Sequence, residues 1–295
     1  MEIKPQSLIT MGKIAKALKA LWWIARKPLL LNRVLTDVDT WQRYVERKFK
    51  LPAGLPVITM NQLFDADHIS MGPMTFLEGG SLPTDIMLLA GLAESIPECR
   101  YFEIGTWMGE SAATLSPRVK SCHTLCLSDE EMRIRGMDEK SIAAHGHFSK
   151  GLNNVTQLRG DSRRFNFGSL DEKFDLVFID GDHHYDFILS DTRNLFRHLM
   201  HDKSIVVWHD YCHHPDRVRF EVMAAILDGI GPERVPLVYH VTHTKCAIFT
   251  GQSYPSQPAD FQVIPGEYYL LDLTRKTVPG QNPEGGKKRR SETES

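Results

Sequence analysis

The sequence predicts an α/β fold, in which a doubly wound sheet of five parallel strands ends in a C-terminal antiparallel hairpin and follows a helical N-terminal extension. Three observations lead to this prediction. From residue 100 onward, short apolar runs alternate with patterns of helical period, as in β-α-β units. Residues 235–241 and 245–250 are two apolar runs joined by a few residues, which is typical of a hairpin. Residues 100–111 place a strand, a glycine turn and the start of a helix in the order found beside the ligand crevice of open α/β sheets.

The five parallel strands are expected where the apolar runs lie. These runs cover residues 100–104, 123–127, 155–158, 174–179 and 204–208. Ahead of them, Ser81 is expected to cap a helix over residues 83–96, because serine is favoured at the N-cap and Pro83 suits the first turn.

Composition and length indicate a globular chain in three parts. Residues 1–80 are expected to form a helical extension with a loop-rich segment, residues 81–275 the main domain, and residues 276–295 a disordered polar tail. A formal net charge of −2 argues against a nucleic-acid partner, which usually requires a basic face. The five cysteines include no C-x-x-C pair, so we expect reduced thiols in a cytoplasmic protein. No apolar run approaches the roughly 20 residues of a membrane span.

Residues 12–26 have helical period, with apolar side chains on one face and lysines interrupting them. Two interpretations stay open. A basic helix of this kind can make peripheral contact with an anionic membrane surface. It can also pack on its own domain or on a second subunit, which would make the protein a homo-oligomer. We favour packing.

The stretch RYFEIGTWMGES, residues 100–111, carries the first functional motif. Its pattern is E-x-G-x-x-x-G, whereas a dinucleotide-binding turn reads G-x-G-x-x-G and faces a pyrophosphate. The carboxylate of Glu103 suits a ligand that carries an ammonium and a sulfonium rather than phosphates. Gly105 has no Cβ, so a ligand is expected to lie close against the backbone there.

Polar side chains also follow the second and third predicted strands. Asp129, or its neighbour Glu130, can accept hydrogen bonds from both hydroxyls of a ribose. In the turn RGDS, Asp161 can accept from the amino group of an adenine, and Ser162 adds a small donor. Because the carboxyl ends of parallel strands meet at one edge, we expect these groups beside the glycine turn.

The fourth and fifth strands end in FIDGDHHYD and VVWHDYCHH. Carboxylates and histidines this close together need charged partners or a metal. Asp180, His209 and Asp210 are expected to converge on one divalent cation, which would orient a hydroxyl and lower its pKa. His183, three residues after Asp180, is the candidate general base, because histidine exchanges protons near neutral pH.

Together, FEIGTWMGES, RGDS, FDLVFIDGDHHY and IVVWHD resemble the class I S-adenosylmethionine-dependent methyltransferases over roughly residues 80–250. The resemblance is to the group that contains macrocin-type sugar O-methyltransferases and cephalosporin hydroxylase-like proteins. It implies a Rossmann-like sheet of seven strands, S-adenosylmethionine as cofactor, and a hydroxyl of a sugar, a glycan or another small molecule as acceptor. The implied cofactor contacts are Glu103, Gly105, Thr106, Gly109, Ser111, Asp129, Asp161, Ser162 and Asp180.

In that group, the D-x-x-H after the fourth strand supplies a metal ligand and a base, which here implies Asp180 and His183. The pair after the fifth strand supplies further ligands and is usually acidic, whereas this chain has His209 before Asp210. Oxygen ligands favour magnesium, while an imidazole shifts the preference toward manganese, iron or zinc. Alternatively, His209 lies behind the ligands or contacts the acceptor.

The resulting hypothesis is O-methylation of a small-molecule hydroxyl, assisted by magnesium or manganese. Two alternatives stay open. One is a metal-dependent oxygenase of the same fold that uses Asp180, His209 and Asp210. The other is a non-catalytic protein that binds an adenosyl ligand.

Overall fold

The computed structural model describes residues 13–27, 38–65, 68–77, 79–259 and 268–277. The chain groups into one compact unit that ends at Asp260 and a second that begins at Phe261. In the second unit, residues 268–277 contain no helix or strand. The tail expected to be disordered lies outside the described residues from position 278 onward.

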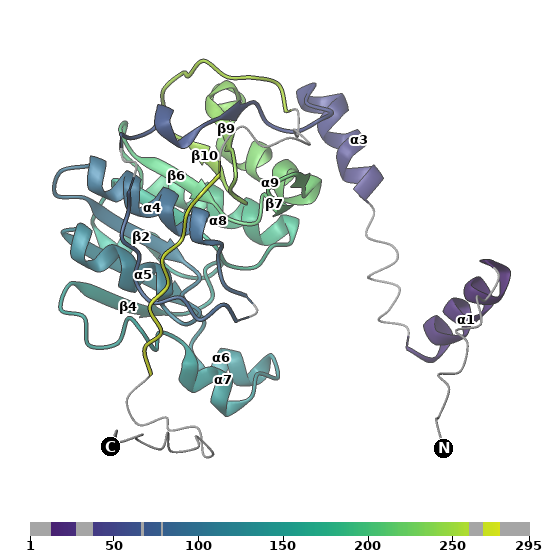
Figure 1. The fold of residues 1–295 in the computed structure, drawn as a ribbon, viewed down its shortest axis with the longest axis horizontal. Coiled ribbons are helices and arrows are strands. Elements are labelled where there is room, and N and C mark those ends of the chain that lie inside the picture. Colours follow the sequence, from purple (N-terminus) through teal and green to yellow (C-terminus); the bar gives the residue numbers. More distant parts are fainter. Residues whose placement is uncertain (1–12, 28–37, 66–67, 78, 260–267, 278–295) are drawn as a thin grey trace, which may run out of the picture. The chain divides into compact units, whose positions relative to one another are not determined.

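A mixed sheet forms the centre of the first unit (Figure 1). Its strands are β1 (Val57–Ile58), β2 (Arg100–Ile104), β3 (Ser121–Cys126), β4 (Val155–Arg159), β5 (Leu176–Ile179), β6 (Ile205–Trp208), β9 (Val238–Val241) and β10 (Ala247–Phe249). They lie in the order β1-β9-β10-β6-β5-β2-β3-β4. Strands β2 to β6 pair in parallel, and β10 pairs antiparallel with β6 and β9. A separate ribbon joins β7 (Cys212–His214) and β8 (Arg217–Val218).

The predicted α/β class and mostly parallel sheet are confirmed, and the five parallel strands and the hairpin lie close to where they were expected. The predicted number of seven strands is wrong. Within the described residues the sheet has eight, because β1 adds beside β9 at the edge. A strand of two residues is too short to show any periodicity in a sequence.

Helices cover both faces of the sheet. Among the described residues, the helices of the chain, including those that do not lie on the sheet, are α1 (Lys13–Arg26), α3 (Val38–Phe49), α4 (Pro83–Ser95), α5 (Glu110–Leu115), α6 (Asp129–Ile134), α7 (Glu139–Ala144), α8 (Tyr185–His198) and α9 (Phe220–Ile230). Short 3-10 turns cover Met60–Gln62, Ser116–Arg118, Phe167–Leu170 and Val235–Leu237. On one face, α4 and α5 pack against a cluster that contains Tyr101 and Val207. On the other face, Trp208 donates from Nε1 to Thr192 of α8 at 2.9 Å, because successive strand residues point to opposite sides.

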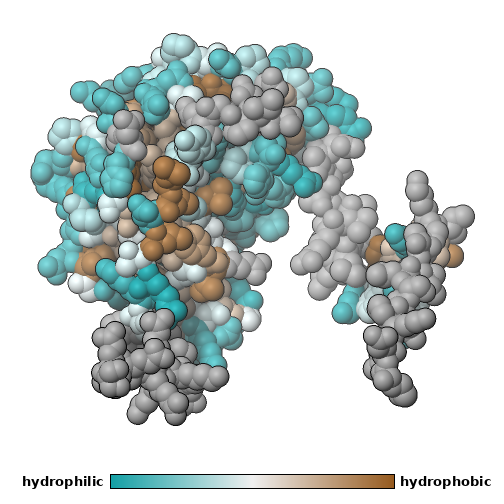
Figure 2. Space-filling model, viewed as in Figure 1, coloured by the Kyte–Doolittle hydropathy of each residue, from teal (hydrophilic) through white to brown (hydrophobic). Residues whose placement is uncertain are grey.

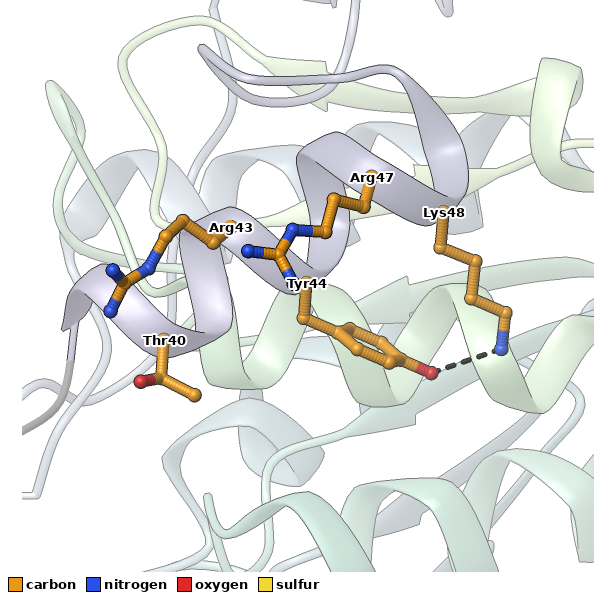
Figure 3. Close-up of a pocket in the computed structure, with 5 residues that line it drawn as sticks. All are labelled: Thr40, Arg43, Tyr44, Arg47 and Lys48. Carbon is orange, nitrogen blue, oxygen red and sulfur yellow. Dashed lines mark hydrogen bonds between the residues drawn. The ribbon is translucent and has the colours of Figure 1, made fainter.

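Polar contacts fasten α3 to α8 and α9. The Asp228 carboxylate accepts hydrogen bonds from Tyr44 Oη at 2.6 Å, Lys48 Nζ at 2.6 Å and Tyr185 Oη at 2.5 Å. Trp41 stacks on Tyr185 with ring centroids 4.8 Å apart. Figure 3 shows the open surface pocket on α3, lined by Thr40, Arg43, Tyr44, Arg47 and Lys48. Helix α3, which belongs to the predicted N-terminal extension, thus packs against α8 and α9.

Helix α1 exposes apolar side chains, some of which show as brown atoms at the right of Figure 2. Leu18 is 63% exposed, Leu21 62% and Trp22 50%. Among the described residues, no helix has the length and apolar character that crossing a bilayer requires. Contact of residues 12–26 with a membrane surface stays a prediction. Unchanged binding to anionic vesicles after deletion of residues 1–30 would contradict it.

Candidate active site

The carboxyl ends of β2, β5 and β6 meet near the middle of the sheet. The strand order reverses between β2 and β5. Strands β3 and β4 lie on one side of β2, whereas β5 and β6 lie on the other side. Open α/β sheets bind ligands at such a point. The loops that follow β2 and β5 touch there, because a Cβ added to Gly105 would lie 1.9 Å from the Asp180 carbonyl oxygen.

This contact changes the interpretation of Gly105. We expected the missing Cβ to leave room for a ligand, but the Asp180 carbonyl fills that room. Gly105 also has a φ of +104°, which disfavours any other residue. Gly109, at φ +79°, has a similar role, because a Cβ there would lie 2.6 Å from Ser149 Oγ. Both glycines therefore allow loops to pack closely.

Glu103 lies at the end of β2 with no exposed surface. Its Oε2 accepts hydrogen bonds from Tyr101 Oη at 2.6 Å and Ser111 Oγ at 2.7 Å. Within the described residues, its buried Oε1 has no hydrogen-bond partner. Burial raises the pKa of the Glu103 carboxyl to about 7, although the hydrogen bond from Tyr101 opposes the rise. One carboxylate oxygen is thus held in place while the other lacks a donor.

The residues between Glu103 and Ser111 differ in whether their polar atoms already have hydrogen-bond partners. Thr106 Oγ1 lies 2.5 Å from Thr124 Oγ1 and accepts from Gln157 Nε2 at 3.1 Å, so its hydroxyl joins neighbouring strands. Trp107 keeps a buried Nε1 that has no partner among the described residues. The turn therefore holds a second buried polar atom that a ligand can satisfy.

A loop formed by residues 68–77 lies on the first turn of α5. Thr75 N donates to Glu110 Oε1 at 2.6 Å, and Gly72 N donates to Thr114 Oγ1 at 2.9 Å. Arg118 also donates to the Ser70 carbonyl. Two hydrogen bonds thus tie this loop to α5, the helix that follows the glycine turn, and a third ties it to the 3-10 turn Ser116–Arg118.

Asp129 is the first residue of α6, and its side chain is 55% exposed. It lies 3.7 Å from Arg159 Nη1, which also donates to Cys126 Sγ at 3.0 Å. Glu131 lies deeper: its carboxylate accepts from Ser128 N at 2.9 Å and from Asp161 N at 3.3 Å. Sequence reasoning missed Glu131, although the spacing S-x-x-E is the signature of a capping box.

Asp161 is held by two arginines. Its carboxylate lies 3.1 Å from Arg163 Nη2 and 3.2 Å from Arg135 Nη2. The hydrogen bond from Arg163 lowers the pKa of the Asp161 carboxyl. Its neighbour Ser162 interacts with Asp191, whose pKa burial raises to about 7. The structure therefore places Asp161 and Ser162 in a network of charged groups.

The predicted cluster after β5 and β6 is present, and it includes one more carboxylate. His209 Nδ1 lies 2.8 Å from Asp180 Oδ1, and His209 Nε2 lies 3.0 Å from Asp85 Oδ2. Asp85, in α4, is fully buried, and its Oδ2 also accepts from Leu82 N at 2.8 Å. Leu82 is accordingly the N-cap residue of α4, and the prediction that Ser81 caps this helix is wrong.

The contact between His209 and Asp85 favours the charged form of both side chains. Burial alone would lower the pKa of the His209 imidazole, but the neighbouring Asp180 raises it well above the usual value. Burial alone would likewise raise the pKa of Asp85, but the hydrogen bond from His209 holds it below the usual value. An imidazole that donates from both nitrogens is an imidazolium.

Asp210 stands at the centre of the remaining charges. Its Oδ2 lies 2.9 Å from His183 Nε2, and its Oδ1 lies 2.7 Å from Lys245 Nζ. Arg219 Nη1 lies 3.7 Å from Oδ2. Burial alone would raise the pKa of the Asp210 carboxyl, but the hydrogen bonds from His183 and His209 hold it far below the usual range. Sequence reasoning missed Lys245, which lies in the turn between β9 and β10.

The side chains predicted to hold a metal are Asp180, His209 and Asp210. Single atoms of Asp180, His209 and Asp210 lie within 4.8 Å of one another, a spacing that one cation can bridge. However, His209 uses one ring nitrogen on Asp180 and the other on Asp85. An imidazolium has no lone pair to offer a metal. The arrangement therefore does not fit a site in which His209 is a ligand.

Residues 102–211 match a family model described as a methyltransferase domain. This part of the chain is thus similar to the methyltransferase domains that the model describes. It begins in β2 and ends just after Asp210, so it contains the glycine turn and most of the charged cluster. Asp85 and Lys245 lie outside the matched residues. No curated protein matches the sequence.

Three solved structures are examples of proteins to which this chain is similar. The YcgJ protein from Bacillus subtilis is 25% identical, with a TM-score of 0.32; the match covers 45% of this chain and 53% of YcgJ, about half its length. The O-methyltransferase TomG from Streptomyces achromogenes is 16% identical over 76% of this chain and 95% of TomG, with a TM-score of 0.40. The methyltransferase PaMTH1 from Podospora anserina is 14% identical over 85% of this chain and 99% of PaMTH1, with a TM-score of 0.44.

Proposed function

We propose that the protein transfers a methyl group from S-adenosylmethionine to a hydroxyl of a sugar or another small molecule. The observation that carries the proposal is the pair formed by His183 and Asp210, 2.9 Å apart, at the strand ends that also hold Glu103. A base that a carboxylate orients, at the same edge of the sheet as the buried Glu103, suits the deprotonation of an acceptor next to a cationic methyl donor.

The residues of the glycine turn fit S-adenosylmethionine. Glu103 Oε1 is buried without a donor, and the ammonium of the methionine moiety would supply one. Asp129 lies after β3, where its carboxylate would accept from the ribose hydroxyls. When bound, the sulfonium supplies an electrophilic methyl group. The remaining predicted contacts, Asp161 and Ser162, are proposed for the adenine side.

The chain's own residues account for the proton. Bound S-adenosylmethionine would supply the methyl group, and its sulfur would keep the electron pair of the broken carbon–sulfur bond, so the acceptor oxygen would have only its proton to lose. His183 Nε2 donates to Asp210, so Nδ1 takes the hydroxyl proton. The resulting imidazolium is stabilised by the Asp210 carboxylate beside it. The products are a methyl ether and S-adenosylhomocysteine.

The oxygenase alternative requires His209 as a metal ligand, and the hydrogen bonds of both ring nitrogens disfavour that role. The non-catalytic alternative shares the cofactor site. It predicts intact binding of S-adenosylhomocysteine and no turnover that Asp180→Ala or His183→Ala would lower.

Calorimetric titration with S-adenosylhomocysteine tests the proposed function. We expect micromolar binding to the wild-type chain, and about tenfold to hundredfold weaker binding to Asp129→Ala, because a charged acceptor contributes about 1.5–3 kcal/mol. Glu139→Ala, an exposed acidic residue in the first turn of α7, is the matched control and is expected to bind normally. No binding to the wild-type chain would overturn the assignment.

Binding is also expected to depend on pH through Glu103. The carboxyl, with a pKa of about 7, is protonated below that pH and must ionise to pair with an ammonium. The affinity for S-adenosylhomocysteine is therefore expected to fall as the pH is lowered from 7.5 to 5.5, by up to about tenfold per unit below pH 7. Calorimetry across this range should show a flat profile for Glu103→Gln. If the affinity of the variant fell equally with pH, a group other than Glu103 would be responsible for the pH dependence.

A further inference from the structure

Asp210, the carboxylate beside the proposed base, already has two cationic side chains next to it. Lys245 Nζ lies 2.7 Å from Asp210 Oδ1, and Arg219 Nη1 lies 3.7 Å from Asp210 Oδ2. The other two carboxylates, Asp180 and Asp85, each lie within 3.0 Å of a ring nitrogen of His209. A divalent cation on Asp210 would therefore lie beside two fixed positive charges, which repel it.

Lys245 is held firmly in this position. Its backbone N–H donates to Asp85 Oδ1 at 2.8 Å, and its carbonyl accepts from Cys212 N at 3.2 Å. Its side chain is only 15% exposed, and the ammonium ends 2.7 Å from Asp210 Oδ1. Asp85 therefore orders both the His209 ring and the backbone of Lys245. One buried carboxylate thus positions both residues.

We propose that the Lys245 ammonium takes, on Asp210, the place that a divalent cation would have in a metal-assisted site, so that this site works without a metal. Lys245 is then a positioning residue: it holds Asp210, and Asp210 orients His183. The orientation of His183 matters for methyl transfer only if the proposed function is correct. Whether the cluster binds a metal is measured without any turnover.

Titration with manganese(II), followed by electron paramagnetic resonance of the free ion, tests the proposal on the full chain. We expect the wild-type protein to bind no manganese more tightly than millimolar, and its melting temperature to be unchanged after dialysis against EDTA. In Lys245→Met the ammonium is lost while the side chain keeps its length, so Asp210 loses its nearest cation. We expect this variant to bind manganese at least tenfold more tightly than wild type.

Lys245→Arg is the matched control, since it keeps the charge and should exclude manganese as wild type does. Micromolar binding of one manganese ion to the wild-type chain, or a lower melting temperature after EDTA, would overturn the proposal. So would a folded Lys245→Met that binds no more manganese than wild type. If Lys245→Met does not fold, the wild-type titration and EDTA comparison decide alone. A failed methyl-transfer assay would not affect the interpretation of the manganese titrations or of the EDTA comparison.

Discussion

Replacing His183 with alanine is expected to lower kcat for methyl transfer by about 10²–10⁴-fold, the usual contribution of a positioned general base. The reason is local: His183 Nε2 is bound to Asp210 at 2.9 Å, and no proton acceptor remains at Nδ1 once the ring is removed. The affinity for S-adenosylhomocysteine should stay within a fewfold of wild type, since the proposed cofactor contacts lie on other residues.

The measurement is the rate of S-adenosylhomocysteine release with a hydroxylated acceptor that the wild-type enzyme methylates. His184→Ala is the matched control. His184 is the adjacent residue and binds Asp182 at 2.5 Å, not Asp210, so its loss should leave kcat within about threefold. If His183→Ala kept more than a tenth of the wild-type kcat, His183 would not be the base.

Replacing Asp85 with alanine is expected to cost about 3–5 kcal/mol of unfolding free energy, the cost of breaking a buried ion pair. The change removes the acceptor of His209 Nε2 and of the backbone N–H groups of Leu82 and Lys245. It leaves a buried imidazolium with one carboxylate fewer and two backbone donors unsatisfied. Urea unfolding followed by circular dichroism would measure the loss.

Asp186→Ala provides the comparison, because Asp186 is also an acidic residue in the first turn of a helix but is exposed. Its loss should cost no more than about 1 kcal/mol through the helix dipole. Asp85→Asn should be intermediate, since the amide oxygen can still accept but carries no charge. A cost below 1 kcal/mol for Asp85→Ala would contradict the bridging role of this carboxylate.

Much of the fold followed from local patterns. The strands from β2 to β6 are short apolar runs. Each strand of a parallel sheet that is buried on both faces needs such a run. The convergence of Asp180, His183, His209 and Asp210 followed as well, because the carboxyl ends of adjacent parallel strands lie side by side. The edge strand β1 was missed since two residues carry no period.

The role of single side chains was less predictable. Gly105 was expected to make room for a ligand, yet its missing Cβ admits the Asp180 carbonyl of another loop. His209 was expected to offer a lone pair to a metal, yet both of its nitrogens face carboxylates. In each case the residue type correctly marked a site of close contact. The group that makes the contact lies in a distant part of the chain.

The sequence by itself determined the order of strands and helices, the glycine turn after β2 and the set of titratable groups after β5 and β6. Only the tertiary structure decided how those groups are charged. Asp85 reaches His209 across 124 positions and Lys245 across 160 positions of the chain. No local pattern encodes such pairs, because burial and charge compensation depend on which distant elements pack together.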